Sequence, residues 1–187
     1  MSLTMGTKRI KLEEGQVYAI PLPNDSYTLA QLYNLHTINS RQSQVTFGFF
    51  NYKFDTLAQL KSEYDKLDLS NPFAIATTNG YPRHYGWEFL GCKPIRTSHN
   101  YKVEISTLGL YRNSAIDPLA FLEPFFGIIP WDATPEEFFI NFLLPNIKLR
   151  KDIKYVKDYS TEDLIKLLGI EHVRVKERLR EENINSN

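Results

Sequence analysis

The residues best suited to specific contacts gather in segment 79–87, whose sequence is NGYPRHYGW. Two tyrosines, an arginine, a histidine and a tryptophan combine rigid aromatic area with adaptable hydrogen-bonding groups, which is the composition of protein contact surfaces. We therefore predict that Tyr81, Arg83, His84 and Tyr85 contact a partner. The alternative that the sequence leaves open is that Tyr81 and Tyr85 only fold back over the end of a sheet.

A second candidate contact is Trp131 with Asp132, beside the acidic pair Glu136 and Glu137. These residues precede a phenylalanine-rich segment, and a tryptophan next to carboxylates could anchor a protein partner. The alternative is simple capping, because acidic side chains at the start of a helix stabilise it through its dipole.

No motif for catalysis or for metal binding is present. The histidines His36, His84, His99 and His172 lie far apart and form neither an HxH nor an HExxH pattern. The single cysteine, Cys92, excludes an internal disulfide and a cysteine-rich zinc site. No GxSxG, GxGxxG or Walker sequence occurs. The sequence therefore predicts no catalytic residue, no metal and no cofactor.

Two other functions stay open at this stage. A hydrolase or nuclease could assemble its site from dispersed residues such as His36, His84 and Glu88, which would then meet in one cleft. A small barrel could bind nucleic acid, but 22 basic and 22 acidic residues give a net charge of zero. The basic stretch Lys148–Lys157 is also interrupted by Asp152. We therefore expect no nucleic-acid partner.

Length and composition indicate one soluble domain covering residues 1–187. Hydrophobic residues make up 42% of the chain and aromatic residues 13%, and this aromatic share favours a β-rich core. No run of about 18 apolar residues occurs, so we expect no membrane association. The N-terminal residues lack the apolar core of a secretory signal, and the lone Cys92 fits a reducing compartment, where we expect it to be buried. The expected location is cytoplasmic.

The contact candidates depend on a sheet that opens with a hairpin. Alternating residues in Gly15–Leu22 and Tyr27–Asn34 predict two strands, and Pro23–Ser26 between them predicts a short turn. Pro21 and Pro23 cannot donate to a strand ladder, so this end of the hairpin should lie at an edge.

Further strands and one helix are predicted before the chain changes character. The predicted segments are a helix over Thr56–Leu67 capped by Asp55, and strands over Val45–Tyr52, Phe73–Thr78, Trp87–Cys92 and Lys102–Thr107. Together they indicate an α+β fold, in which residues 15–110 form a small bent antiparallel sheet or partly open barrel.

Residues 113–183 predict a helical extension, so that three or four helices pack on the sheet. Thr134 and Pro135 are typical of a helix start, and the apolar stretch Pro135–Leu144 predicts a buried helix. Ser160 and Gly169 should begin and end another helix, and the charged segment Glu171–Asn183 predicts a last one.

The first half of the chain resembles the immunity protein 26 family of bacterial polymorphic-toxin systems. The resemblance rests on Gly15–Leu22 (GQVYAIPL), Tyr27–Leu32 (YTLAQL), Phe47–Phe50 and the Trp87 strand. Family members tend to carry an acidic residue after the glycine, where this chain has Gln16. The resemblance implies a non-enzymatic protein that binds a cognate toxin and neutralises it in the cytoplasm of the producing cell.

Overall fold

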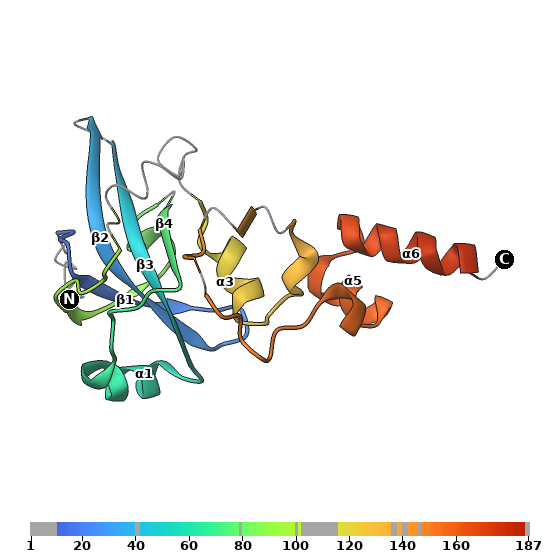
Figure 1. The fold of residues 1–187 in the computed structure, drawn as a ribbon, viewed down its shortest axis with the longest axis horizontal. Coiled ribbons are helices and arrows are strands. Elements are labelled where there is room, and N and C mark those ends of the chain that lie inside the picture. Colours follow the sequence, from blue (N-terminus) through green and yellow to red (C-terminus); the bar gives the residue numbers. More distant parts are fainter. Residues whose placement is uncertain are drawn as a thin grey trace, which may run out of the picture.

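The computed structural model describes residues 11–39, 42–78, 80–99, 101, 116–135, 138–139, 142–145 and 147–185. Five strands in this part of the chain form one antiparallel sheet in the order β4-β3-β2-β1-β5 (Figure 1). The strands are β1 (Gln16–Pro21), β2 (Tyr27–Asn39), β3 (Gln42–Phe54), β4 (Ala74–Thr78) and β5 (Glu88–Cys92). The sheet is open, because β4 and β5 are its two edges. The predicted strand Lys102–Thr107 lies outside the described residues.

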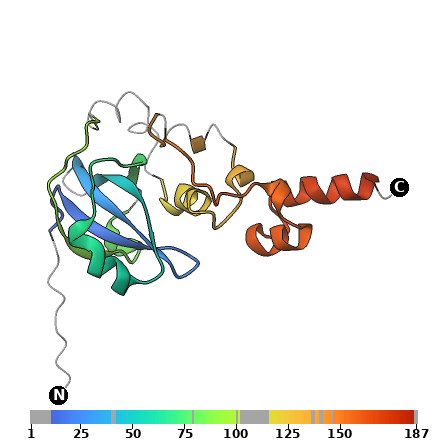
Figure 2. The same ribbon diagram turned by 60° about the horizontal axis from the view of Figure 1, so that its bottom comes forward.

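Four α-helices accompany the sheet in the described part of the chain. They are α1 (Leu57–Glu63), α3 (Leu119–Phe125), α5 (Thr161–Leu168) and α6 (Val173–Asn185). The predicted α+β class, the open antiparallel sheet and the helical C-terminal end are therefore confirmed. Figures 1 and 2 show α5 and α6 at the end of the molecule away from the sheet, with α3 between them and the strands.

The opening hairpin forms where the sequence predicts it. The Asp25 N–H donates to the carbonyl of Leu22 over 3.1 Å, and the Leu22 N–H donates to the carbonyl of Ser26 over 2.8 Å. Asp25 has a φ of +60°, a left-handed conformation that aspartate tolerates in turns. Pro21 pairs with Tyr27 on β2, but β5 pairs with β1 only as far as Ala19. The missing N–H of Pro21 therefore leaves no gap in the β1–β5 ladder.

One face of the sheet carries an aromatic core. Tyr18, Phe47 and Phe49 lie on this face and are at most 4% exposed. Phe49 meets Phe121 of α3 edge-on, with ring centroids 4.9 Å apart. Edge-to-face pairs add to the stabilisation that burial of apolar area provides. The helix α3 therefore packs on this face of the sheet.

The helical region also covers the β4 edge of the sheet. The Ile75 N–H donates to the carbonyl of Phe142 over 3.1 Å, and the Leu144 N–H donates to the carbonyl of Phe73 over 2.9 Å. Residues Phe142–Leu144 therefore run beside β4, and the prediction of a helix through Leu144 is wrong. Pairing with an open strand edge satisfies backbone groups that would otherwise face solvent, and this outweighs the local helical pattern.

The opposite face of the sheet is covered by α1, by the 3₁₀ turn η1 (Tyr64–Lys66) and by Tyr33. Leu60 of α1 is fully buried, and the Tyr64 ring lies against Gly91 of β5. The helix begins after Thr56, whose side chain accepts a hydrogen bond from the Gln59 N–H over 3.1 Å. The predicted cap at Asp55 is therefore wrong by one residue. Threonine and aspartate are both good caps, and the sequence could not separate these neighbours.

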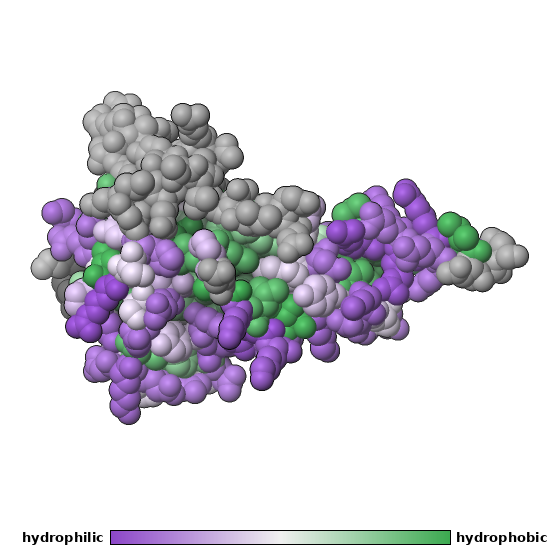
Figure 3. Space-filling model, in the orientation of Figure 1, coloured by the Kyte–Doolittle hydropathy of each residue, from purple (hydrophilic) through white to green (hydrophobic). Residues whose placement is uncertain are grey.

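The C-terminal helices follow the predicted signals. The Ser160 side chain accepts from the Asp163 N–H over 3.1 Å, and Gly169 ends α5 with a φ of +83°. The Arg174 Nε–H of α6 donates to the carbonyl of Asp132 over 2.9 Å, which ties this end to the rest of the fold. Figure 3 shows a mainly hydrophilic surface on α6, broken by separate hydrophobic spots.

Gly48 is required by close packing. An added Cβ would lie 2.3 Å from Cζ of Tyr33, which is fully buried. We expect Gly48→Ala to lower the free energy of unfolding by about 1–3 kcal/mol, measured by urea denaturation. The cost should be smaller in a Tyr33→Leu background, because the shorter side chain removes the clash. An equal cost in both backgrounds would contradict this packing.

Buried tyrosines should make the fold sensitive to alkali. The Tyr18 hydroxyl donates to Oε1 of Gln16 over 2.7 Å, and burial, followed by the charge of Cys92, raises the pKa of Tyr18 to about 12. An unfolded tyrosine has a pKa of about 10. Between these values the folded state holds more protons than the unfolded state, so stability falls as the pH rises.

We expect the free energy of unfolding to decrease between about pH 10 and pH 12, more steeply in the native chain than in Tyr18→Phe. Tyr155→Phe, which changes a tyrosine that is 37% exposed, is the matched control and should keep the native slope. Urea denaturation at several pH values measures this. Identical slopes for the native chain and Tyr18→Phe would refute the assignment.

Candidate partner-binding surface

The predicted contact residues lie in the connection from β4 to β5, here called the 80–87 loop. Thr78, the last residue of β4, anchors its beginning: the hydroxyl donates to the carbonyl of Gly80 over 2.7 Å. Gly80 lies under the loop, where an added Cβ would come within 3.1 Å of Nδ1 of His84 and 3.3 Å of the Tyr85 ring. Asn79, which precedes it, lies outside the described residues.

Backbone hydrogen bonds fix the shape of this loop. Residues Pro82–His84 form a 3₁₀ turn, η2, in which the His84 N–H donates to the carbonyl of Tyr81 over 2.8 Å. The carbonyl of Pro82 accepts from the N–H groups of Tyr85 and Trp87, over 3.2 and 2.9 Å. Pro82 is itself buried, and its ring restricts the backbone before any partner arrives. The loop is therefore preorganised.

Aromatic packing attaches the loop to the core. Trp87 is 8% exposed and lies edge-on to Phe47, with ring centroids 5.1 Å apart. Tyr85 packs on the same indole at a centroid distance of 5.4 Å, and it is half-buried. The order from core to surface is thus Phe47, Trp87 and Tyr85. A contact made through Tyr85 would be supported by the folded interior rather than by a mobile side chain.

Arg83 and His84 are the exposed members of the loop. The Arg83 guanidinium lies 5.7 Å from the centroid of the Tyr81 ring, a cation–π contact that restricts the long side chain. Nδ1 of His84 lies 3.2 Å from the Tyr81 N–H, and Nε2 lies 3.3 Å from Nε of Arg83. A neutral imidazole has one acceptor nitrogen, so these two hydrogen bonds are alternatives. Arg83 and His84 can therefore both offer N–H groups to an acidic partner group.

The four residues predicted in this segment thus lie together. The segment has features of both interpretations, the exposed contact surface and the tyrosines that fold back on the sheet. Tyr81 and Tyr85 fold back partly over the end of the sheet, whereas Arg83 and His84 face solvent. Sequence reasoning missed the supporting role of Pro82 and Trp87. Their order in the segment was a usable signal, because a proline and a tryptophan flanking the polar residues could have marked the two anchoring points.

Trp131 and Asp132 are used inside the fold. Trp131 is 6% exposed and stacks on Phe139 at a centroid distance of 4.4 Å. Oδ1 of Asp132 accepts a hydrogen bond from the Val156 N–H over 2.6 Å. A partner could reach the Trp131 ring only by unpacking it. Glu136 and Glu137, which the sequence placed beside this pair, lie outside the described residues.

Cys92 is exposed, so the prediction that it is buried is wrong. It is the last residue of β5, which in the described part of the chain is an edge strand with a neighbour on one side only. The alternation of residues along a strand identifies two faces, but it cannot show which strand will be left at the edge of the sheet.

The dispersed residues of a possible hydrolase do not share a contact in the described part of the chain. His84 hydrogen-bonds within its own loop, and Glu88 forms an ion pair with Lys61 of α1. The side chain of His36 lies outside the described residues. Within those residues, no group of three His, Cys, Asp or Glu side chains is placed to hold a metal ion.

Among the described helices, none combines the length and the apolar character needed to cross a membrane.

Comparisons with known proteins return no match: no family model fits the chain, and no curated protein or solved structure is significantly similar to it. The likeness to the immunity protein 26 family therefore rests on the quoted residues alone.

The packing order of the loop predicts different effects for its inner and outer residues. Trp87→Ala should lower the free energy of unfolding by about 3–5 kcal/mol, because it empties a buried aromatic site. Arg83→Ala should change it by less than about 0.5 kcal/mol, because Arg83 is exposed. Urea denaturation of both variants measures the difference. A large loss of stability in Arg83→Ala would show that this side chain supports the fold and is not free to bind.

Proposed function

We propose that this protein is an immunity protein: it binds a cognate bacterial toxin and neutralises it by occlusion, without catalysing a reaction. It acts in the cytoplasm of the cell that produces the toxin. The resemblance of the hairpin and of β3 to the immunity protein 26 family suggests this role. The observation that carries the proposal is the 80–87 loop, where Arg83 and His84 are exposed on a support built from Pro82 and Trp87.

The physical state of this loop favours binding. Association costs free energy when side chains and loops must be ordered, and a loop already fixed by hydrogen bonds and ring packing avoids much of that cost. Arginine and tyrosine are enriched among the residues that dominate binding energy. We infer that Arg83 meets a carboxylate of the toxin, since a guanidinium can form two parallel hydrogen bonds with it. Tyr81 and Tyr85 supply aromatic area on either side.

The other functions that the sequence left open receive less support. A hydrolase would need a base and an acid within hydrogen-bonding distance, and His84 and Glu88 contact different residues. A nucleic-acid site would need a basic face with exposed aromatic residues, whereas the chain as a whole carries no net charge.

The proposal implies that a gene next to that of this chain encodes the toxin, and the test uses the toxic domain of that toxin, purified in an inactivated form. We expect the native chain to bind it, and Arg83→Ala to weaken the affinity at least about tenfold, as expected for a central arginine. Tyr85→Ala should also weaken it. Arg180→Ala is the matched control, because Arg180 is an exposed arginine on α6, at the far end of the molecule (Figure 1).

Two results would contradict the proposal at different levels. No binding of the native chain to the neighbouring toxic domain would remove the immunity function. Binding that is unchanged in Arg83→Ala and Tyr85→Ala would keep the function but place the interface on another surface.

A further inference from the structure

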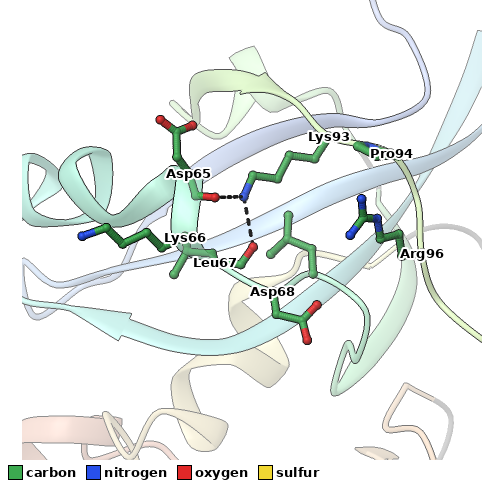
Figure 4. A pocket seen from close by; sticks show the side chains of 8 residues that line it. Asp65, Lys66, Leu67, Asp68, Lys93, Pro94 and Arg96 are labelled. Carbon is green, nitrogen blue, oxygen red and sulfur yellow. Dashed lines mark hydrogen bonds between the residues drawn. The ribbon is translucent and has the colours of Figure 1, made fainter.

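A cavity of about 460 Å³ lies beyond the other end of β5, away from the 80–87 loop (Figure 4). It opens between the segment that follows α1 and the segment that follows β5. The residues that line it are Asp65, Lys66, Leu67, Asp68, Leu69, Lys93, Pro94 and Arg96. Its volume falls within the range of small-molecule sites, about 300–1,000 Å³.

Lys93 gives this cavity a fixed wall. Its Nζ donates to the carbonyls of Tyr64, Leu67 and Asp65 over 2.7, 3.0 and 3.1 Å, and lies 4.8 Å from the centroid of the Tyr64 ring. An ammonium group has three donors, so all of them are used. The Lys93 carbonyl accepts in turn from Nε2 of the fully buried Gln31 over 2.7 Å. The Lys93 side chain and backbone are therefore both held in place by hydrogen bonds.

Arg96 brings a second positive charge to the cavity. Its guanidinium points towards the space between Lys93 and Leu67 (Figure 4). Within the described residues it forms neither a hydrogen bond nor an ion pair. All five of its N–H donors are therefore available to a ligand.

Within the described residues, the two acidic residues of the lining form no ion pair with Arg96. Oδ1 of Asp68 accepts from the Ser70 N–H over 3.0 Å, and Oδ2 accepts from the Ser70 hydroxyl over 2.9 Å. In Figure 4 the Asp65 carboxylate points away from Arg96, whereas the Asp68 carboxylate lies on the same side of the cavity as Arg96. Three cations, Lys66, Lys93 and Arg96, line the cavity against these two carboxylates, so the net charge of the lining is positive and favours an anionic ligand.

The remaining wall is apolar. Leu67, Leu69 and Pro94 supply aliphatic surface, and Leu69 is 5% exposed. We propose that this cavity binds a small aliphatic carboxylate, whose carboxylate group pairs with Arg96 and whose hydrocarbon body packs on the two leucines and the proline. One guanidinium matches one carboxylate in a two-bonded geometry. This site is separate from the 80–87 loop and does not depend on toxin binding.

N-acetylleucine is a suitable probe, because it joins a carboxylate to a leucine side chain. We expect saturable NMR shifts in the full chain, confined to residues 65–69 and 93–96 and including the Arg96 Nε–H. N-acetylleucinamide, which lacks the charge, should cause no saturable shift. Equal binding of the amide would overturn the proposal, and so would inorganic phosphate binding more tightly than N-acetylleucine at the same residues.

Substitutions locate the charge that matters. Arg96→Gln should weaken N-acetylleucine binding at least tenfold and should leave the spectrum of the fold intact, since Arg96 is exposed. Lys66→Gln is the matched control, because Lys66 also lines the cavity but its side chain points away from Arg96 (Figure 4). Its affinity should stay within twofold of the native value. Unchanged binding of N-acetylleucine to Arg96→Gln would refute the site. The affinity of Arg96→Gln for the toxic domain should equal that of the native chain, because the two sites are separate.

Discussion

The packing of Trp87 against Phe47 connects the core of this protein to its proposed binding surface. The two rings meet edge-on, 5.1 Å between centroids and 71° between planes, at the boundary between the aromatic core and the 80–87 loop. Towards the core, the Phe47 ring lies edge-on to the ring of Tyr18 on β1. Outward, Trp87 supports Tyr85. One indole therefore serves both the stability of the fold and the shape of the surface that we assign to binding.

The two edges of the sheet differ in how far other backbone segments pair with them, and both candidate sites lie at the β5 edge. The β4 edge is covered by Ile116 and Leu143, which form bridges with Thr78 and Ala74. Within the described residues, β5 has a strand neighbour on one side only. The 80–87 loop precedes β5 in the chain, and the residues Lys93–Arg96 that line the cavity follow it. A strand of five residues is about 17 Å long, so one short edge strand separates the two sites by that distance.

Local sequence signals predicted most of the helices, strands and turns. Tertiary contacts determined which segments pair with the sheet and which side chains are buried. The hairpin at Pro23–Ser26 and the helix between Ser160 and Gly169 depend on nearby residues alone, so the chain itself reveals them. The segment Phe142–Leu144 looks helical, but after one turn from Phe139 it hydrogen-bonds to the open edge of β4 instead. The same limit applies to Trp131, because composition shows that a side chain can bind a partner but not whether the fold has already buried it.

Hydrogen exchange can show whether the 80–87 loop is already ordered in the free chain, because it reports on the loop both before and after binding. In the free chain, the amides of His84, Tyr85 and Trp87 should exchange slowly, since each donates to a backbone carbonyl within the loop. Adding the neighbouring toxic domain should slow exchange across residues 80–88 further. Rapid exchange of these amides in the free chain, or protection that appears only on another surface, would contradict a preformed partner-binding loop.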